Sequence, residues 1–102
     1  MALKRTEVSD LIQQCLIALN AERAEDEQIA IGEDTPLLGG ESQLDSLSFV
    51  ALVGDLEERL YDATGQDIVL VGELDSSGDQ PFRSVSTLTD RIVEMAAQLT
   101  AE

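Results

Sequence analysis

The feature that most constrains the fold is a set of three separate apolar stripes, each with the spacing of one face of a helix. One stripe lies within residues 4–22, one follows Ser46 and one follows Ser84. Their members are Val8, Leu11, Ile12, Cys15, Leu16 and Leu19, then Phe49, Leu52, Val53, Leu56 and Leu60, and finally Val85, Leu88, Ile92, Met95, Ala96 and Leu99. Amphipathic helices of this length bury their stripes against one another. We therefore expect an all-α fold, a small antiparallel-type bundle of three main helices plus short turns.

The composition agrees with such a bundle. Apolar residues make up 43% of the chain, aromatic residues only 3%, and tryptophan is absent. The core must therefore be built from aliphatic side chains, and the aromatic residues that favour sheets are scarce. At 102 residues the chain has the size of one domain, and we expect a single domain over residues 1–102.

The connections between the stripes are long. Within residues 23–45, we expect Ile29 and Ile31 to turn inward, and Thr35-Pro36 predicts one short helical turn that Gly39-Gly40 ends. Residues 66–83 are less regular, with a β-branched run at 68–71 that favours an extended segment and turn residues at 75–81. The acids within residues 75–81 do not predict a calcium-binding loop, because the glycine is not at the position that such a loop requires and the closing glutamate is absent.

The charge of the chain is strongly negative. It has 21 acids and 6 bases, a formal net charge of −15, and residues 22–58 hold eleven acids but the single base Arg23. Such a surface repels nucleic acid and anionic lipid and attracts basic patches on other proteins. No apolar run approaches membrane-spanning length, so we expect neither nucleic-acid binding nor membrane insertion.

The N-terminus shows no signal-peptide pattern and Cys15 has no partner for a disulfide, so we expect a cytoplasmic protein with Cys15 in the core.

Catalytic chemistry has few residues available. The sequence contains no histidine, which excludes Ser-His and Cys-His nucleophile pairs and histidine metal sites. Adjacent acids such as Glu57-Glu58 on a helix are typical of a solvated face. No glycine-rich phosphate loop is present. We expect neither enzymatic activity nor a metal site.

Ser46 has two interpretations. It can be the N-cap of the second helix, with its oxygen accepting from a first-turn N–H. Alternatively, Asp45 caps the helix and leaves the Ser46 hydroxyl available at the positive end of the helix dipole, where a phosphodiester is favoured. Helix physics alone leaves both open.

Residues 45–60 as a whole favour the second interpretation. Asp45-Ser46-Leu47 and the gapless run after it, Val50, Leu52-Val53, Leu56, Glu57-Glu58 and Leu60, resemble the attachment helix of acyl carrier proteins. The upstream E-D-T-P-L-L and the downstream F-R-S-V-S-T-L-T-D-R-I resemble the segments that flank this helix in the same family. The resemblance covers about residues 5–98, which we take as the core of the domain, and weakens at 66–81.

The resemblance implies a carrier whose cofactor is 4′-phosphopantetheine, joined to Ser46 by a phosphopantetheinyl transferase that uses coenzyme A. The thiol of the arm would hold an acyl group as a thioester. Partners would be this transferase and enzymes that transfer or activate acyl groups and carry basic patches, and we expect a monomer. In this family the second helix is the docking face, which implies docking residues Asp45, Leu47, Asp55, Glu57 and Glu58.

Several positions depart from the family pattern. Ser48 and Ala51 stand where the common fatty-acid carriers have acids, and Gly54 stands where they often have a bulky apolar residue. The segment T-P-L-L-G-G-E-S-Q-L-D-S-L resembles the sequences of carriers in specialised acyl or polysaccharide pathways more than those of fatty-acid carriers. Two alternatives remain, an aminoacyl or peptidyl carrier and an acidic interaction domain that carries no arm.

Overall fold

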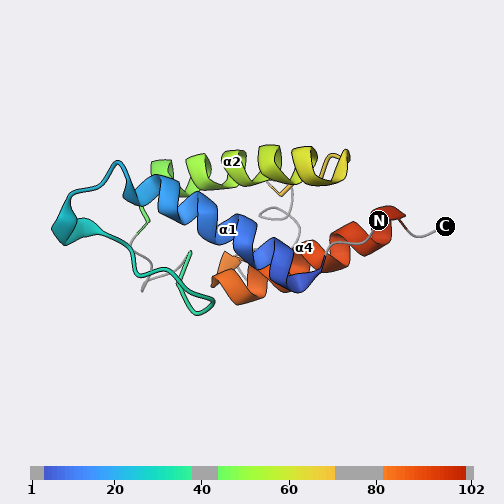
Figure 1. The fold of residues 1–102 in the computed structure, drawn as a ribbon, viewed down its shortest axis with the longest axis horizontal. Helices are drawn as coiled ribbons and strands as arrows, with labels where there is room; N and C mark the ends of the chain where they lie inside the picture. Colours follow the sequence, from blue (N-terminus) through green and yellow to red (C-terminus); the bar gives the residue numbers. More distant parts are fainter. Residues whose placement is uncertain (1–3, 38–43, 71–81, 101–102) are drawn as a thin grey trace.

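The predicted all-α bundle is confirmed by the computed structural model, which describes residues 4–37, 44–70 and 82–100. Helix α1 spans Arg5–Asn20, α2 spans Ser46–Thr64 and α4 spans Val85–Thr100, and a short 3-10 helix, η1, covers Glu25–Glu27. Figure 1 shows α1 running in the opposite direction to α2 and α4. Helix α1 packs against both of them.

The three predicted stripes form the core. They bury Val8, Ile12, Cys15 and Leu16 of α1, Phe49, Leu52, Val53, Leu56 and Leu60 of α2, and Val85, Leu88, Ile92 and Ala96 of α4. Leu11, Leu19 and Met95 lie partly buried against this core. The side chain of Leu99 lies outside the described part. Phe82, which the periodicity did not single out, is fully buried and meets Phe49 edge to face, with ring centroids 5.4 Å apart.

The connection after α1 is ordered by the last residue of that helix. The side-chain amide of Asn20 donates to the carbonyl oxygen of Ile29 at 2.9 Å, and the Ile29 N–H donates to Asn20 Oδ1 at 2.7 Å. These paired bonds hold Ile29 in the core, and Ile31 packs partly buried beside it. The inward direction predicted for both isoleucines is confirmed.

The helical turn predicted at Thr35-Pro36 is wrong. The segment is extended, and Pro36 forms an isolated antiparallel bridge with Ser84. The Leu37 N–H donates to the carbonyl of Arg83 at 3.2 Å, and the Val85 N–H donates to the carbonyl of Thr35 at 3.1 Å. The fixed φ of proline suits an extended segment as well as a helix start, so pairing with a distant segment decided the outcome. The predicted continuation through Leu38 to Gly39-Gly40 lies outside the described residues.

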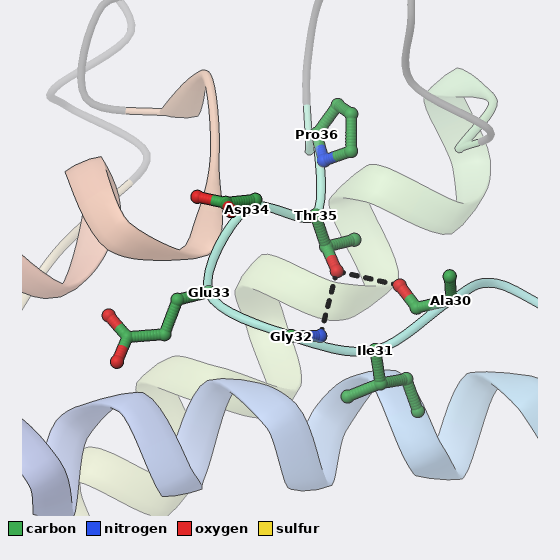
Figure 2. A pocket seen from close by; sticks show the side chains of 7 residues that line it. All are labelled: Ala30, Ile31, Gly32, Glu33, Asp34, Thr35 and Pro36. Atoms are coloured by element: carbon green, nitrogen blue, oxygen red, sulfur yellow. Dashed lines mark hydrogen bonds between the residues drawn. The ribbon is translucent and has the colours of Figure 1, made fainter.

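Thr35 closes a loop of its own, which Figure 2 shows. Its hydroxyl accepts from the Gly32 N–H at 2.9 Å and donates to the carbonyl of Ala30 at 2.6 Å. The loop 30–36 surrounds an open pocket of about 330 Å³. Both hydrogen-bonding capacities of the hydroxyl are used within the loop, so its function there is structural.

The segment after α2 is extended. Gly65 has a φ of 73° and ends the helix, and its N–H donates to the carbonyl of Tyr61. Ile68 and Leu70 are buried and Val69 is exposed, an alternation typical of extended backbone. Residues 71–81, which include the predicted turn residues at 75–81, lie outside the described part.

Helix α4 begins at Val85, directly after Ser84, where the third stripe places it. The Thr87 N–H donates to Ser84 Oγ at 3.2 Å, and the Ser84 N–H donates to Thr87 Oγ1 at 3.0 Å. Ser84 is therefore the N-cap, and the reciprocal bond satisfies a second backbone donor.

Two buried threonines allow a matched test of this packing. Thr35 makes the two bonds described above, whereas the buried Thr89 Oγ1 has no hydrogen-bond partner among the described residues. Thr35→Val should lower the free energy of unfolding by about 2 kcal/mol, and Thr89→Val should leave it unchanged or raise it by about 1 kcal/mol. Urea denaturation followed by circular dichroism measures both. Equal losses in the two variants would show that the Thr89 hydroxyl is hydrogen-bonded in the folded protein.

Candidate functional site at the start of helix α2

Asp45, and not Ser46, occupies the cap position of α2. Its backbone is extended, and its Oδ1 accepts from the Ser48 N–H at 2.7 Å. This bond, followed by one from the Ser48 hydroxyl, lowers the pKa of the Asp45 carboxyl below its ordinary value of 3.8. The predicted capping by Asp45 is thus confirmed, and the Ser48 hydroxyl is engaged with that carboxylate.

Ser46 is the first residue of α2. The structure describes the backbone of Ser46 but not its side chain. The first N–H groups of a helix have no partner within the helix, and the dipole makes this end positive. Since Asp45 satisfies the third of these groups, the position of Ser46 suits a negatively charged phosphodiester.

The outer face of α2 beside Ser46 is uncharged. Leu47 is 84% exposed and Val50 65% exposed, and Ala51 and Gly54 are exposed on the same face. A Cβ atom at position 54 would meet no atom within 4 Å. Glycine in a helix interior costs about 1 kcal/mol relative to alanine, and no contact within the described chain explains it here.

The predicted docking acids divide into two groups along α2. Asp45 and Leu47 lie at its start, and the other three acids lie in its second half. Asp55 forms an ion pair with Arg59 at 3.2 Å, and Glu57 Oε2 accepts from the Leu70 N–H at 2.6 Å. Glu58 is exposed.

The sequence did not indicate that Glu57 holds the segment after α2, because that contact depends on the course of residues 66–70. It also did not single out Val50 and Tyr61 as large exposed apolar side chains. Both positions lie off the buried stripe of α2, and this is the signal that could have revealed them.

A crevice of about 170 Å³ opens between α1 and α2. It is lined by Cys15, Ala18, Leu19, Glu22, Ala51, Leu52 and Asp55, and we call it the α1–α2 crevice. Cys15 is only 1% exposed, and burial, with a further contribution from the Asp55 carboxylate, raises the pKa of its thiol to about 12. The predicted core position of Cys15 is confirmed.

Comparisons with models of protein families, with curated proteins and with solved structures found no match to this chain. Among residues 4–37, 44–70 and 82–100, no helix combines the length and the apolar character that crossing a membrane requires. The same residues contain no cluster of three or more histidine, cysteine or acidic side chains that could hold a metal ion.

The cap at Asp45 predicts a pH dependence of stability. Because its folded pKa lies below 3.8, the carboxylate stabilises the fold above that pH, and this contribution is lost as the pH falls through the lower folded pKa. Wild type should therefore be more stable than Asp45→Ala at neutral pH, and the difference should shrink in acid. Asp45→Asn, which keeps an accepting oxygen, is the control, and its advantage over Asp45→Ala should not vary with pH. Urea midpoints over a pH series measure this, and a constant gap between wild type and Asp45→Ala would contradict it.

The raised pKa of Cys15 predicts an inert thiol. With a pKa of about 12 in place of 9.0, the thiol of the folded protein forms very little of the reactive thiolate at mildly alkaline pH. Alkylation by iodoacetamide should be slower than in the urea-unfolded chain by a factor on the order of 100 or more. Cysteine in the same urea solution controls for the reagent. Native and unfolded rates within about tenfold of each other would show that Cys15 is accessible and ionised.

Proposed function

We propose that this chain is a carrier protein of the acyl carrier type, in which Ser46 accepts 4′-phosphopantetheine from coenzyme A. The observation that carries the proposal is the division of roles at the start of α2. Asp45 accepts the capping hydrogen bond at 2.7 Å, so Ser46 is not needed as a cap. Leu47, 84% exposed, shows that this end of the helix faces outward.

The reaction suits this position. The Ser46 hydroxyl oxygen attacks the phosphorus that bears the pantetheine arm, the pyrophosphate bond of coenzyme A breaks, and the nucleotide half leaves. In this proposal the hydroxyl proton passes to a base of the transferase. The phosphodiester then lies at the positive end of α2, where the dipole and the free first-turn N–H groups favour it.

The arm, once attached, supplies a thiol that holds an acyl group as a thioester. The chain itself contributes position: tethering makes the acyl group available at high effective concentration to any enzyme that docks on α2. Exposed acids such as Asp45 and Glu58 attract basic patches on these enzymes and raise the association rate. We place the carrier in the cytoplasm as a monomer, where a lone thiol such as Cys15 stays reduced.

In this proposal, the enzymes that act on the carried acyl group belong to a fatty-acid-like or specialised acyl pathway. Ser48 and Ala51 leave the first half of α2 without an acid, so the pattern differs from that of common fatty-acid carriers. Two alternatives to this function remain. An aminoacyl or peptidyl carrier would have the same arm but carry an amino acid or peptide on it, and an acidic interaction domain would carry no arm.

Loading the purified protein tests the proposal. Incubation with coenzyme A and a broad-specificity phosphopantetheinyl transferase should add the mass of one arm, and Ser46→Ala should add none. Ser48→Ala is the matched control, because it removes a hydroxyl two residues further along the same helix and should still be loaded. Intact-mass spectrometry gives the result. An arm on Ser46→Ala, or an unmodified wild type, would refute the proposed site.

A further inference from the structure

The α1–α2 crevice has an apolar floor and an acidic rim. The floor is formed by the buried Cys15 and Leu52 and the half-buried Leu19. The rim carries the exposed Glu22 and Asp55, whose side chain is 39% exposed. Its volume of about 170 Å³ is close to the roughly 150 Å³ of a cavity that admits benzene. The crevice therefore has room for one side chain, but not for a whole secondary-structure element.

The charges at the crevice are negative overall. Glu22 and Asp55 contribute two carboxylates, and Arg59, paired with Asp55 at 3.2 Å, contributes one positive charge. Arg59 also donates to Gln14 Oε1 of α1 at 3.2 Å, so its charge is shared between Asp55 and α1. The rim keeps a net negative charge in a chain whose formal charge is −15. A side chain with an aliphatic stem and a cationic head matches such a floor and rim.

The crevice also lies where an enzyme acting at Ser46 must make contact. Ala51, at the mouth of the crevice, follows Ser46 by five residues, which is about 7.5 Å along the helix axis. A specific interface covers roughly 800 Å² of each partner, so a partner centred on Ser46 also covers Ala51. The short side chain of Ala51 leaves the mouth of the crevice open.

We propose that the α1–α2 crevice receives an arginine or lysine side chain of the enzyme that docks at Ser46. The stem of this side chain packs between Leu19 and Leu52, and its cationic head meets the exposed Glu22. The inference rests on the proposed function for the identity of the partner. A tethered acyl chain is the competing occupant, but the Glu22 carboxylate at the mouth suits a cation better than a hydrocarbon.

Two pairs of variants test the proposal in the transferase reaction. Glu22→Lys is compared with Glu25→Lys, an identical charge change at an exposed position outside the crevice, in η1. Ala51→Leu, which fills the mouth, is compared with Ala63→Leu, at another exposed alanine of α2. Circular dichroism and urea midpoints confirm that all four fold.

At low salt we expect Glu22→Lys and Ala51→Leu to lower kcat/KM for the carrier by about tenfold, and the two controls to change it by less than about twofold. The effect of Glu22→Lys should shrink at high salt, whereas that of Ala51→Leu should persist, because salt screens charge but not steric exclusion.

Three outcomes would overturn the inference. If wild type is loaded and each variant matches its control, the crevice proposal fails and the carrier proposal stands. If wild type is not loaded, both fail. If Ala51→Leu is loaded at the wild-type rate, and an attached acyl chain raises the melting temperature of wild type but not that of Ala51→Leu, the occupant is the acyl chain.

Discussion

The structure depends on the burial of the aliphatic stripe of α1 between two helices. Helix α1 packs against both α2 and α4, and its Val8, Ile12 and Leu16 are fully buried. Each buried side chain of this kind contributes about 1.5–3 kcal/mol, which makes α1 the common support of the other two helices. The direction of α2, and with it the outward position of Leu47, follows from how its own stripe meets α1.

Charge opposes this packing, and Arg5 counters part of it. Its guanidinium donates to Asp90 at 2.8 Å, to Glu33 at 2.7 Å and to Ser86 Oγ at 2.7 Å, so one base joins α1 to α4 and to the loop before Pro36. The hydrogen bonds with Asp90 and then Glu33 raise the pKa of Arg5. Exposed ion pairs individually contribute little, but here one cation relieves repulsion between two acids from different segments.

Local chemistry made much of the fold and site predictable. The apolar stripes predict which face of each helix is buried. The residue types at the helix ends also suit their positions: Asp45 and Ser84 accept capping hydrogen bonds, and Gly65 adopts a positive φ. Contacts between distant segments were not predictable in the same way. The bridge of Pro36 with Ser84, the ring contact of Phe82 with Phe49 and the α1–α2 crevice all require two parts of the chain to meet, and no spacing within one segment encodes that meeting.

On the outer face of α2, contacts within the chain engage part of the acidic charge. Glu57 is committed to the Leu70 N–H and Asp55 to Arg59, so these acids present less charge to a partner than their number suggests. Glu58 is exposed and Asp45 lies at the helix start, with the uncharged Val50 and Ala51 between them. If α2 is the docking face, as the proposed function requires, a partner would meet two separated negative regions across an apolar gap. In that proposal such spacing would select among basic surfaces by the distance between their cations, and would add specificity to attraction.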